Sequence, residues 1–340
     1  MASPHRLVLT IDAMASMATA AEIVTASLLA QQQGLASIRL VGDAQKLEDA
    51  VRQRGASTSE LQIVHTDQYV GRRENGVRAT KIKRNTSLQL AADLSHTHGG
   101  PWITFGNGNA LREVIRTSLS VGGRLCPFAS RLTFDGRAVT VLDVGPYVHT
   151  TGAQLTQFGL MGAAFHALST QVSTPKVGLL SGEQSVSHCP DHLRETHLGL
   201  HEKCPQYIGL VTGEDISRQA PDVLVVDSQF GSFFRQRELH LQRDIDLSAP
   251  SEDKRSWRGM FNRSLKPADT LRSQGLESIV VLGAYTLAVY RPEAENEASV
   301  LSAIRDAVNV NELNVTDRIR HDLSLDDAKA FRSTTEHPMI

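Results

Sequence analysis

Cysteine, aromatic side chains and long apolar runs are all scarce in this chain of 340 residues. Its three cysteines are an odd number, which argues against a disulfide framework and favours a reducing compartment. No apolar run approaches the roughly 20 residues that a membrane-spanning helix needs. The apolar stretch at residues 7–11 is too short for the core of a secretory signal. We therefore expect a cytoplasmic protein without a membrane span.

Net charge is also small. Lysine and arginine contribute 35 residues and aspartate and glutamate 37, so the net charge is −2. A nearly neutral chain has no overall positive field to attract a nucleic acid, so we expect no nucleic-acid partner. Hydrophobic residues make up 41% of the chain, which suffices for a large core in one large domain or two smaller ones.

Short apolar runs alternate with helical patterns along most of the chain. Because these runs are apolar without strict alternation, they indicate a mostly parallel sheet with helices on both faces, a three-layer α/β/α sandwich. Expected strands cover residues 7–11, 38–41, 61–64, 102–105, 131–134, 139–142, 176–180, 207–211, 223–226, 279–282 and 285–290. Expected helices cover residues 20–33, 44–54, 86–96, 111–119, 155–168, 191–201, 293–309 and 311–322, with a basic loop at 72–84.

The strand pattern disappears between residues 233 and 275. This polar, charged segment predicts a pair of helices that protrudes from the sheet. We find no internal repeat and no low-complexity linker that would mark a domain boundary. The expected organisation is one α/β domain over residues 1–325, with the helical projection at 233–275 and a C-terminal tail at 326–340.

The segment 101–117 combines an apolar strand, a turn with Gly106 and Asn107, and a helical pattern. A strand that delivers a glycine-rich turn onto a helix start is a common anion-binding arrangement. Asn107 can either donate to a ligand or hold the turn through its own side chain. A second segment of this kind runs from the strand at 139–142 through Asp143 and Gly145 to the helix at 155–168.

Other polar residues also follow strands or precede helices. Asp12, Asp143 and Asp227 each come at the end of an expected strand, where an aspartate can cap a helix or take part in catalysis. The basic segment precedes the helix at 86–96, whose Thr86 and Ser87 can cap and donate. Its cations can bind an anion or be solvated. The histidines of the helix at 191–201 lack the acidic residue of a zinc-binding His-Glu-x-x-His motif, so we expect no metal.

Several short motifs, taken in order, resemble those of the PlsX family, the bacterial phosphate acyltransferases. The resemblance extends over roughly residues 6–309, and its strongest part is the strand end at 142–145 with the helix that follows. The motifs are Asp12-Ala13-Met14, Val41-Gly42-Asp43, Gly106-Asn107, Leu142-Asp143-Val144-Gly145 with Leu155, Gln157, Phe158, Met161 and Gly162, and the strand at 222–227.

This resemblance implies transfer of an acyl group from acyl-carrier protein to inorganic phosphate, which gives acyl phosphate for phospholipid synthesis. It implies a homodimer that needs no cofactor and no metal. The catalytic residues that it implies are Asp12, Asp143, Asp227 and Glu183. The phosphate- or substrate-binding residues that it implies are Arg78, Lys81, Lys83, Ser87, Gly106 and Asn107.

The loops depart from the family pattern. Ala15-Ser16-Met17 stand where the family has Gly-Gly-Asp, and Ser187 stands where a lysine is expected. Residues 228–232 replace the family's Gly-Phe-Thr-Gly-Asn. Two alternatives to an active phosphate acyltransferase therefore stay open. One is a catalytically lapsed homologue that binds acyl-carrier protein or a partner subunit, and the other is a phosphotransacetylase-like enzyme with another acyl donor.

The resemblance also places a pair of long helices at 233–275, at the tip of a dimer. Trp257, Met260, Phe261 and Leu265 recur there at helical spacing and form one apolar face flanked by cations. Such a face can pack against a partner subunit or lie in a membrane interface. The expected location is therefore cytoplasmic, with weak peripheral contact to a membrane.

Overall fold

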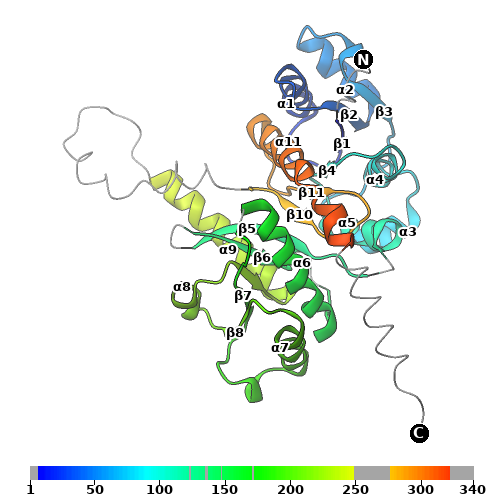
Figure 1. The fold of residues 1–340 in the computed structure, drawn as a ribbon. Coiled ribbons are helices and arrows are strands. Elements are labelled where there is room, and N and C mark those ends of the chain that lie inside the picture. Colours follow the sequence, from blue (N-terminus) through cyan, green and yellow to red (C-terminus); the bar gives the residue numbers. More distant parts are fainter. Residues whose placement is uncertain are drawn as a thin grey trace, which may run out of the picture. The chain divides into compact units, whose positions relative to one another are not determined.

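The computed structural model describes residues 7–121, 124–134, 137–146, 148–170, 172–248 and 276–321 (Figure 1). Its internal contacts divide the chain into two compact units. The first unit holds Met1–Phe128, Leu168–Gln171 and Glu277–Ile340, and the second holds Ala129–Ala167 and Val172–Leu276. We describe each unit by itself.

The first unit is an α/β layer structure. Its strands are β1 (Val8–Asp12), β2 (Ser37–Gly42), β3 (Gln62–His65), β4 (Trp102–Thr104), β10 (Ile279–Val281) and β11 (Ala288–Tyr290). Its helices are α1 (Ala20–Gln32), α2 (Ala44–Gln53), α3 (Gly76–Ile82), α4 (Ser87–His98), α5 (Gly108–Val114) with a π-helical turn at Ile115–Leu119, and α11 (Glu297–Glu312). A short turn of 3-10 helix covers Thr58–Glu60, and residues 315–321 are helical.

Strand order in this unit is β3-β2-β1-β4-β11-β10. The neighbours run parallel except for β10 and β11, which form an antiparallel pair. Ile11 lies between Leu40 of β2 and Ile103 of β4, and all three side chains are fully buried. Strands of this kind need helices on both faces to cover them. Helix α1 packs between α2 and α11 on one face, and α4 and α5 pack on the other (Figure 1).

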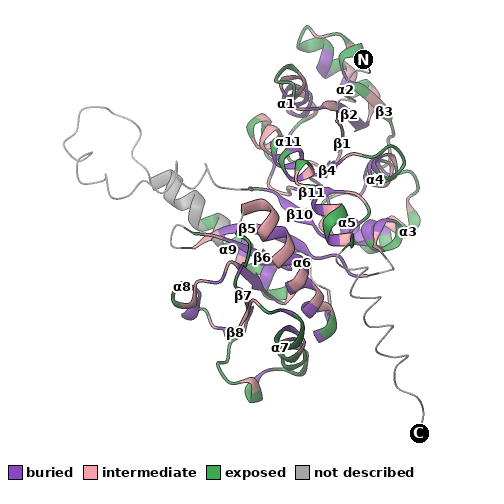
Figure 2. Ribbon diagram, in the orientation of Figure 1, coloured by how far each residue is buried: buried purple, intermediate pink, exposed green. Residues whose placement is uncertain are grey.

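The second unit has strands β5 (Phe128–Phe134), β6 (Arg137–Leu142), β7 (Val177–Leu180), β8 (Tyr207–Val211) and β9 (Val223–Val225). Its helices are α6 (Gly152–Thr170), α7 (Asp191–Lys203), α8 (Asp215–Gln219) and α9 (Ser228–Ser248), with a turn of 3-10 helix at Val186–His188. Strand order is β5-β6-β9-β7-β8, with an antiparallel β5–β6 hairpin and parallel pairs elsewhere. Figure 2 shows the buried residues concentrated in the strands and the exposed ones on the outer sides of the helices.

Helix starts follow the capping residues that the sequence carries. The Asp43 carboxylate accepts from Lys46 N at the start of α2, and Thr86 Oγ1 accepts from Gln89 N at the start of α4. Asn75 caps α3 in the same way, through Arg78 N. Each cap gives a partner to one of the backbone donors that a helix start leaves open.

The predicted α/β fold, with a mostly parallel sheet and helices on both sides, is confirmed. The prediction of a basic loop over residues 72–84 is wrong, because residues 76–82 form α3. Charge dominates the composition there and obscures a helix whose buried face consists only of Gly76 and Ala79. No helix among the described residues is long and apolar enough to cross a membrane.

Of the predicted helical projection, only the first helix is described, as the later part of α9. The predicted apolar face of Trp257, Met260, Phe261 and Leu265 lies outside the described residues, as does the tail at 326–340. A single domain over residues 1–325 stays a prediction.

Candidate active site

In the first unit, Asp12 lies at the carboxyl end of β1 and is 2% exposed. Thr104 Oγ1, at the end of the neighbouring strand β4, donates to Asp12 Oδ2 at 2.8 Å, and Met14 N donates to Asp12 Oδ1 at 3.2 Å. The Ser87 hydroxyl, at the start of α4, is also hydrogen-bonded to this carboxyl. Two strands and one helix start thus bring an aspartate and two hydroxyls together. Of these three, the motifs pointed to Asp12 and Ser87.

Burial raises the pKa of Asp12 to about 6, against its hydrogen bonds from Ser87, Thr104 and Met14 N, which lower it. Burial likewise raises the pKa of Asp306 on α11 to about 6, where Ser278 N donates to the carboxyl at 2.9 Å. In both cases the folded chain holds, between about pH 4 and pH 6, a proton that the unfolded chain has already released.

These two carboxyls give stability an unusual pH dependence. Because their pKa is raised in the folded state, each contributes stability below pH 3.8 that is lost as the pH rises through about 6. Between pH ~4 and ~7, each should lower the free energy of unfolding by roughly 2 kcal/mol. In Asp12→Asn the part due to Asp12 should vanish while the part due to Asp306 remains, and Asp306→Asn should show the reverse. Urea unfolding across this pH range measures the free energy of unfolding. If its dependence on pH is the same in Asp12→Asn as in the wild type, the assignment to Asp12 is wrong.

Ala15 follows Asp12 in a left-handed conformation, with φ at +57°. It stands where the resemblance places a glycine, the residue that adopts such a φ without strain. A Cβ on Gly106 would lie 3.2 Å from the Cβ of Ala15, so the β1 loop closely approaches the turn after β4. The backbone conformation expected for glycine is therefore present, and the alanine methyl group occupies the space next to Gly106.

Ala15→Gly should stabilise the protein by about 1 kcal/mol, because glycine removes the clash of a left-handed alanine. Ala13→Gly is the matched control: Ala13 is not left-handed, so the same exchange should destabilise by about 0.5–1 kcal/mol through added freedom of the unfolded chain. Urea unfolding of both variants measures the two signs. A loss of stability in Ala15→Gly would contradict the prediction.

In the turn after β4, the side chain of Asn107 is hydrogen-bonded to backbone groups of the protein. Asn107 caps α5, its Oδ1 accepting from Ala110 N at 3.0 Å. Its amide nitrogen donates to the carbonyls of Gly71 and Glu74, both at 2.9 Å, and to that of Arg72 at 3.4 Å. A Cβ on Gly76 would lie 2.4 Å from Ala110 N, so the start of α3 packs directly on the start of α5. Of the two roles left open for Asn107, the structure shows the one that holds the turn.

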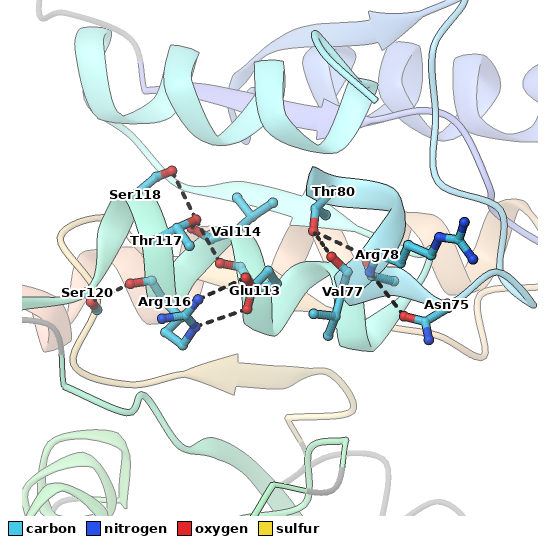
Figure 3. Close-up of polar contacts among 11 residues, drawn as sticks. Asn75, Val77, Arg78, Thr80, Glu113, Val114, Arg116, Thr117, Ser118 and Ser120 are labelled. Atoms are coloured by element: carbon cyan, nitrogen blue, oxygen red, sulfur yellow. Dashed lines mark hydrogen bonds and ion pairs between the residues drawn. The ribbon is translucent and has the colours of Figure 1, made fainter. Parts of the chain in front are cut away.

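The predicted phosphate-binding cations lie on and beside α3. Lys83 Nζ donates to Glu74 Oε1 at 2.8 Å and to Tyr69 O at 2.9 Å. It therefore links the end of α3 to the residues that precede this helix. Arg78 and Lys81 are exposed on α3. Figure 3 shows Arg78 extending away from Glu113 and Arg116, which pair with each other on α5.

In the second unit, the ends of β6 and β9 meet. Asp143 is fully buried, its Oδ1 accepts from Gly145 N at 3.1 Å, and its own N–H donates to Val226 O at 3.2 Å. Asp227 Oδ1 accepts from Gln229 N at 2.8 Å at the start of α9. Gly231, in the first turn of α9, lies against Asp143, because a Cβ there would be 1.9 Å from Asp143 O. Two of the predicted catalytic aspartates are thus neighbours.

The start of α7 also reaches this strand end. His192 Nε2 lies 3.5 Å from Asp227 Oδ2, and both side chains remain partly exposed. Ser228 Oγ links the β6–α6 loop to α9, donating to Val148 O at 2.9 Å. Glu183 is exposed, and its N–H donates to Ser181 Oγ at 3.0 Å. No contact among the described residues joins the Glu183 carboxylate to Asp143 or Asp227.

Thr104 and His192 are missed by reasoning from the sequence. Thr104 lies inside an apolar strand, and His192 belongs to a histidine-rich helix considered only for metal binding. Another histidine of that helix, His197, contacts the hydroxyl of Tyr207 at 2.9 Å. Within the described ranges, no group of three or more His, Cys, Asp or Glu residues is arranged to hold a metal ion.

Relatives of this chain are named phosphate acyltransferases, which is the activity that the motifs imply. The phosphate acyltransferase of Trichlorobacter lovleyi is 28% identical over 342 residues, which cover 95% of this chain and 96% of that protein. The phosphate acyltransferase of Marinobacter nauticus is 28% identical over 328 residues, with 92% of this chain and 94% of that protein covered.

Solved structures share the fold. A phosphotransacetylase from Streptococcus pyogenes superposes with a TM-score of 0.60 at 11% identity, covering 90% of this chain and 94% of its own. A branched-chain phosphotransacylase from Enterococcus faecalis superposes with a TM-score of 0.52 at 14% identity, covering 89% and 98%. The family model described as "Fatty acid synthesis protein" matches residues 7–318. The resemblance found in the motifs is thereby confirmed, and the chain belongs to the fatty acid synthesis protein family.

Proposed function

We propose that this protein is a phosphate acyltransferase, which transfers an acyl group from acyl-carrier protein to inorganic phosphate. A phosphate oxygen attacks the thioester carbonyl, the carbon–sulfur bond breaks, and the thiolate leaves and takes up a proton. The observation that carries this proposal is the family match over residues 7–318, together with relatives that bear this name and are covered over almost their whole length. The product is an acyl phosphate for phospholipid synthesis.

Each strand-end cluster, taken by itself, carries polar groups of kinds that this reaction needs. Attack by phosphate requires the anion to be held in line with the carbonyl, and the developing oxyanion requires donors. Asp12 orients the hydroxyls of Ser87 and Thr104 beside Gly106. Catalytic roles for Asp143, Asp227 and Glu183, and phosphate binding by Arg78, Lys81 and Lys83, remain predictions.

His192 is the residue that we assign to protonation of the leaving thiolate. Its imidazole is partly exposed and lies against Asp227, a carboxylate that can orient it. Such proton transfer contributes typically 10²–10⁴-fold, so His192→Gln should lower kcat by about 100-fold. The KM for phosphate should be unchanged, because glutamine keeps the polarity and the approximate size.

Purified protein, incubated with acyl-acyl-carrier protein and phosphate, tests the activity itself. Acyl phosphate can be trapped with hydroxylamine while phosphate-dependent release of the carrier thiol is followed. Acyl-coenzyme A serves as a second donor, and exclusive use of it would favour the phosphotransacetylase-like alternative. A folded protein that binds the carrier but forms no acyl phosphate from either donor is the lapsed homologue.

We also propose a homodimer that is cytoplasmic and makes weak peripheral contact with membranes. Light scattering of the purified chain tests the dimer. Co-sedimentation with anionic vesicles at low salt tests the membrane contact, which Trp257→Ala/Phe261→Ala should abolish. Wild-type protein that stays in the supernatant and remains dimeric would assign this face to the subunit interface.

A further inference from the structure

Residues 69–84 carry a charge unlike that of the rest of the chain. They contain six lysines and arginines and a single acidic residue, Glu74, while the whole chain has a net charge of −2. Opposite charges are therefore not spread evenly over the first unit. A local cluster of this size produces a positive potential that attracts an acidic partner and speeds its encounter.

Helix α3 carries two of these cations, Arg78 and Lys81, and both are exposed beside apolar side chains. Its Gly76 and Ala79 face the core, and α3 packs along α5 (Figure 3). Ile82 is 64% exposed and Val77 is 42% exposed, each one helical turn from a cation at i, i+4. The outward side chains are Tyr69, Arg72, Arg73, Val77, Arg78, Lys81, Ile82 and Arg84, which we call the basic surface.

Most cations of the basic surface are not neutralised. Lys83, which lies behind it, is paired with Glu74. Lys81 is near Glu113, but that carboxylate already holds Arg116 through two hydrogen bonds. Among the described residues, no carboxylate pairs with Arg73, Arg78 or Arg84. These guanidinium groups are therefore available to a partner.

The basic surface borders the strand-end cluster of Asp12. Arg72 Nη1 donates to Phe105 O at 2.7 Å, and Asn107 binds the carbonyls of Gly71, Arg72 and Glu74. At its other end, Arg84 is three residues before Ser87, which is hydrogen-bonded to Asp12. A molecule bound on the basic surface is thus held next to the end of β4 and the start of α4.

We propose that the basic surface is the docking site for the acidic carrier protein that delivers the acyl thioester. The identity of this partner rests on the proposed function, but the surface and the charge of its partner rest on the structure alone. Four of the six cations of the segment are arginines, whose forked guanidinium matches carboxylates in a bidentate manner. Val77 and Ile82 provide the apolar centre that a protein interface needs.

A lipid surface fits these observations less well. Helix α3 has only seven residues, and its exposed apolar side chains are Val77 and Ile82. Helices that lie in a membrane interface are longer and carry tryptophan, phenylalanine or leucine on the buried face. An acidic protein is therefore the occupant that we assign, and the membrane is the competing outcome of the test.

The test uses the full-length protein and purified, acidic acyl-carrier protein labelled with a fluorophore. Arg78→Glu/Lys81→Glu should weaken carrier binding at least tenfold and raise the KM for acyl carrier. The control is Lys176→Glu/Lys203→Glu, which alters the charge equally at two exposed lysines of the second unit. Control binding should stay within twofold, and wild-type binding should weaken steadily with salt.

The outcomes separate this inference from the proposed function. Equal carrier binding by wild type and Arg78→Glu/Lys81→Glu overturns the inference. A variant whose KM rises for phosphate but not for the carrier also overturns it, and supports phosphate binding by these two cations. Binding of anionic vesicles, but not of the carrier, through these two residues also overturns it. A wild type that binds the carrier here but forms no acyl phosphate overturns only the proposed function.

Discussion

Gly231→Ala should destabilise the protein by at least about 3 kcal/mol. Gly231 lies in the first turn of α9, where its N–H donates to Asp227 O at 2.8 Å. A Cβ there would lie 1.9 Å from Asp143 O and 2.7 Å from Val226 Cγ2. Asp143 O belongs to the backbone and cannot rotate away, so α9 and the end of β6 must separate. We expect activity to fall as well, since this movement also separates Asp143 from Asp227.

Gly182→Ala is the matched control for this prediction. It lies in the same unit, in a turn where no heavy atom comes within 4 Å of the added Cβ and where φ is not left-handed. It should change the free energy of unfolding by no more than about 0.5 kcal/mol. Urea unfolding followed by circular dichroism measures both variants. A Gly231→Ala protein with the midpoint of the wild type would show that the strand end accommodates a side chain.

Asn107→Asp should destabilise the first unit by about 3 kcal/mol or more, because it places a charge that cannot donate against three carbonyl oxygens. Asn107 is 6% exposed, and its amide donates to Gly71 O, Arg72 O and Glu74 O. Aspartate keeps the cap at Ala110 N but has no N–H group. The loss therefore isolates the contribution of the amide to holding 71–75 against α5.

Asn75→Asp is the control with the same substitution and the same capping role. Asn75 Oδ1 accepts from Arg78 N at 3.0 Å, and the residue is exposed. Aspartate caps a helix as well as asparagine does, so stability should be unchanged or slightly higher. Urea unfolding and a phosphate-binding titration of both variants decide the role of Asn107. Full stability with lost phosphate binding in Asn107→Asp would make it a ligand donor.

The roles of Gly231 and Asn107 affect different units, so their effects should be separable. Gly231 is in the second unit and Asn107 in the first. Mutations that share no partners usually add within about 0.5 kcal/mol. The double variant Asn107→Asp/Gly231→Ala should therefore lose the sum of the two single losses if the protein unfolds in one step. A smaller loss would indicate that the two units unfold separately, contrary to the single domain predicted over residues 1–325.

The sequence by itself determined the order of the strands and of the longer helices, because apolar runs and helical spacing depend on near neighbours. It also determined the cap at Thr86, where a short polar side chain precedes a helical pattern. The strand-end position of Asp12 follows in the same way from the apolar run before it. The family motifs were readable because each is a contiguous stretch.

Only the tertiary structure decided what lies beside these elements. Residues 76–82 form a helix whose Gly76 fits against Ala110 N of α5, a contact between segments far apart in sequence. Two further contacts also join distant segments. Asn107 donates to the 71–75 loop, and Thr104 donates to the carboxylate of Asp12. His192 meets Asp227 across 35 residues of chain only because the start of α7 lies at the end of β9. Local patterns specify the elements, whereas partners depend on packing between distant segments, which no local pattern records.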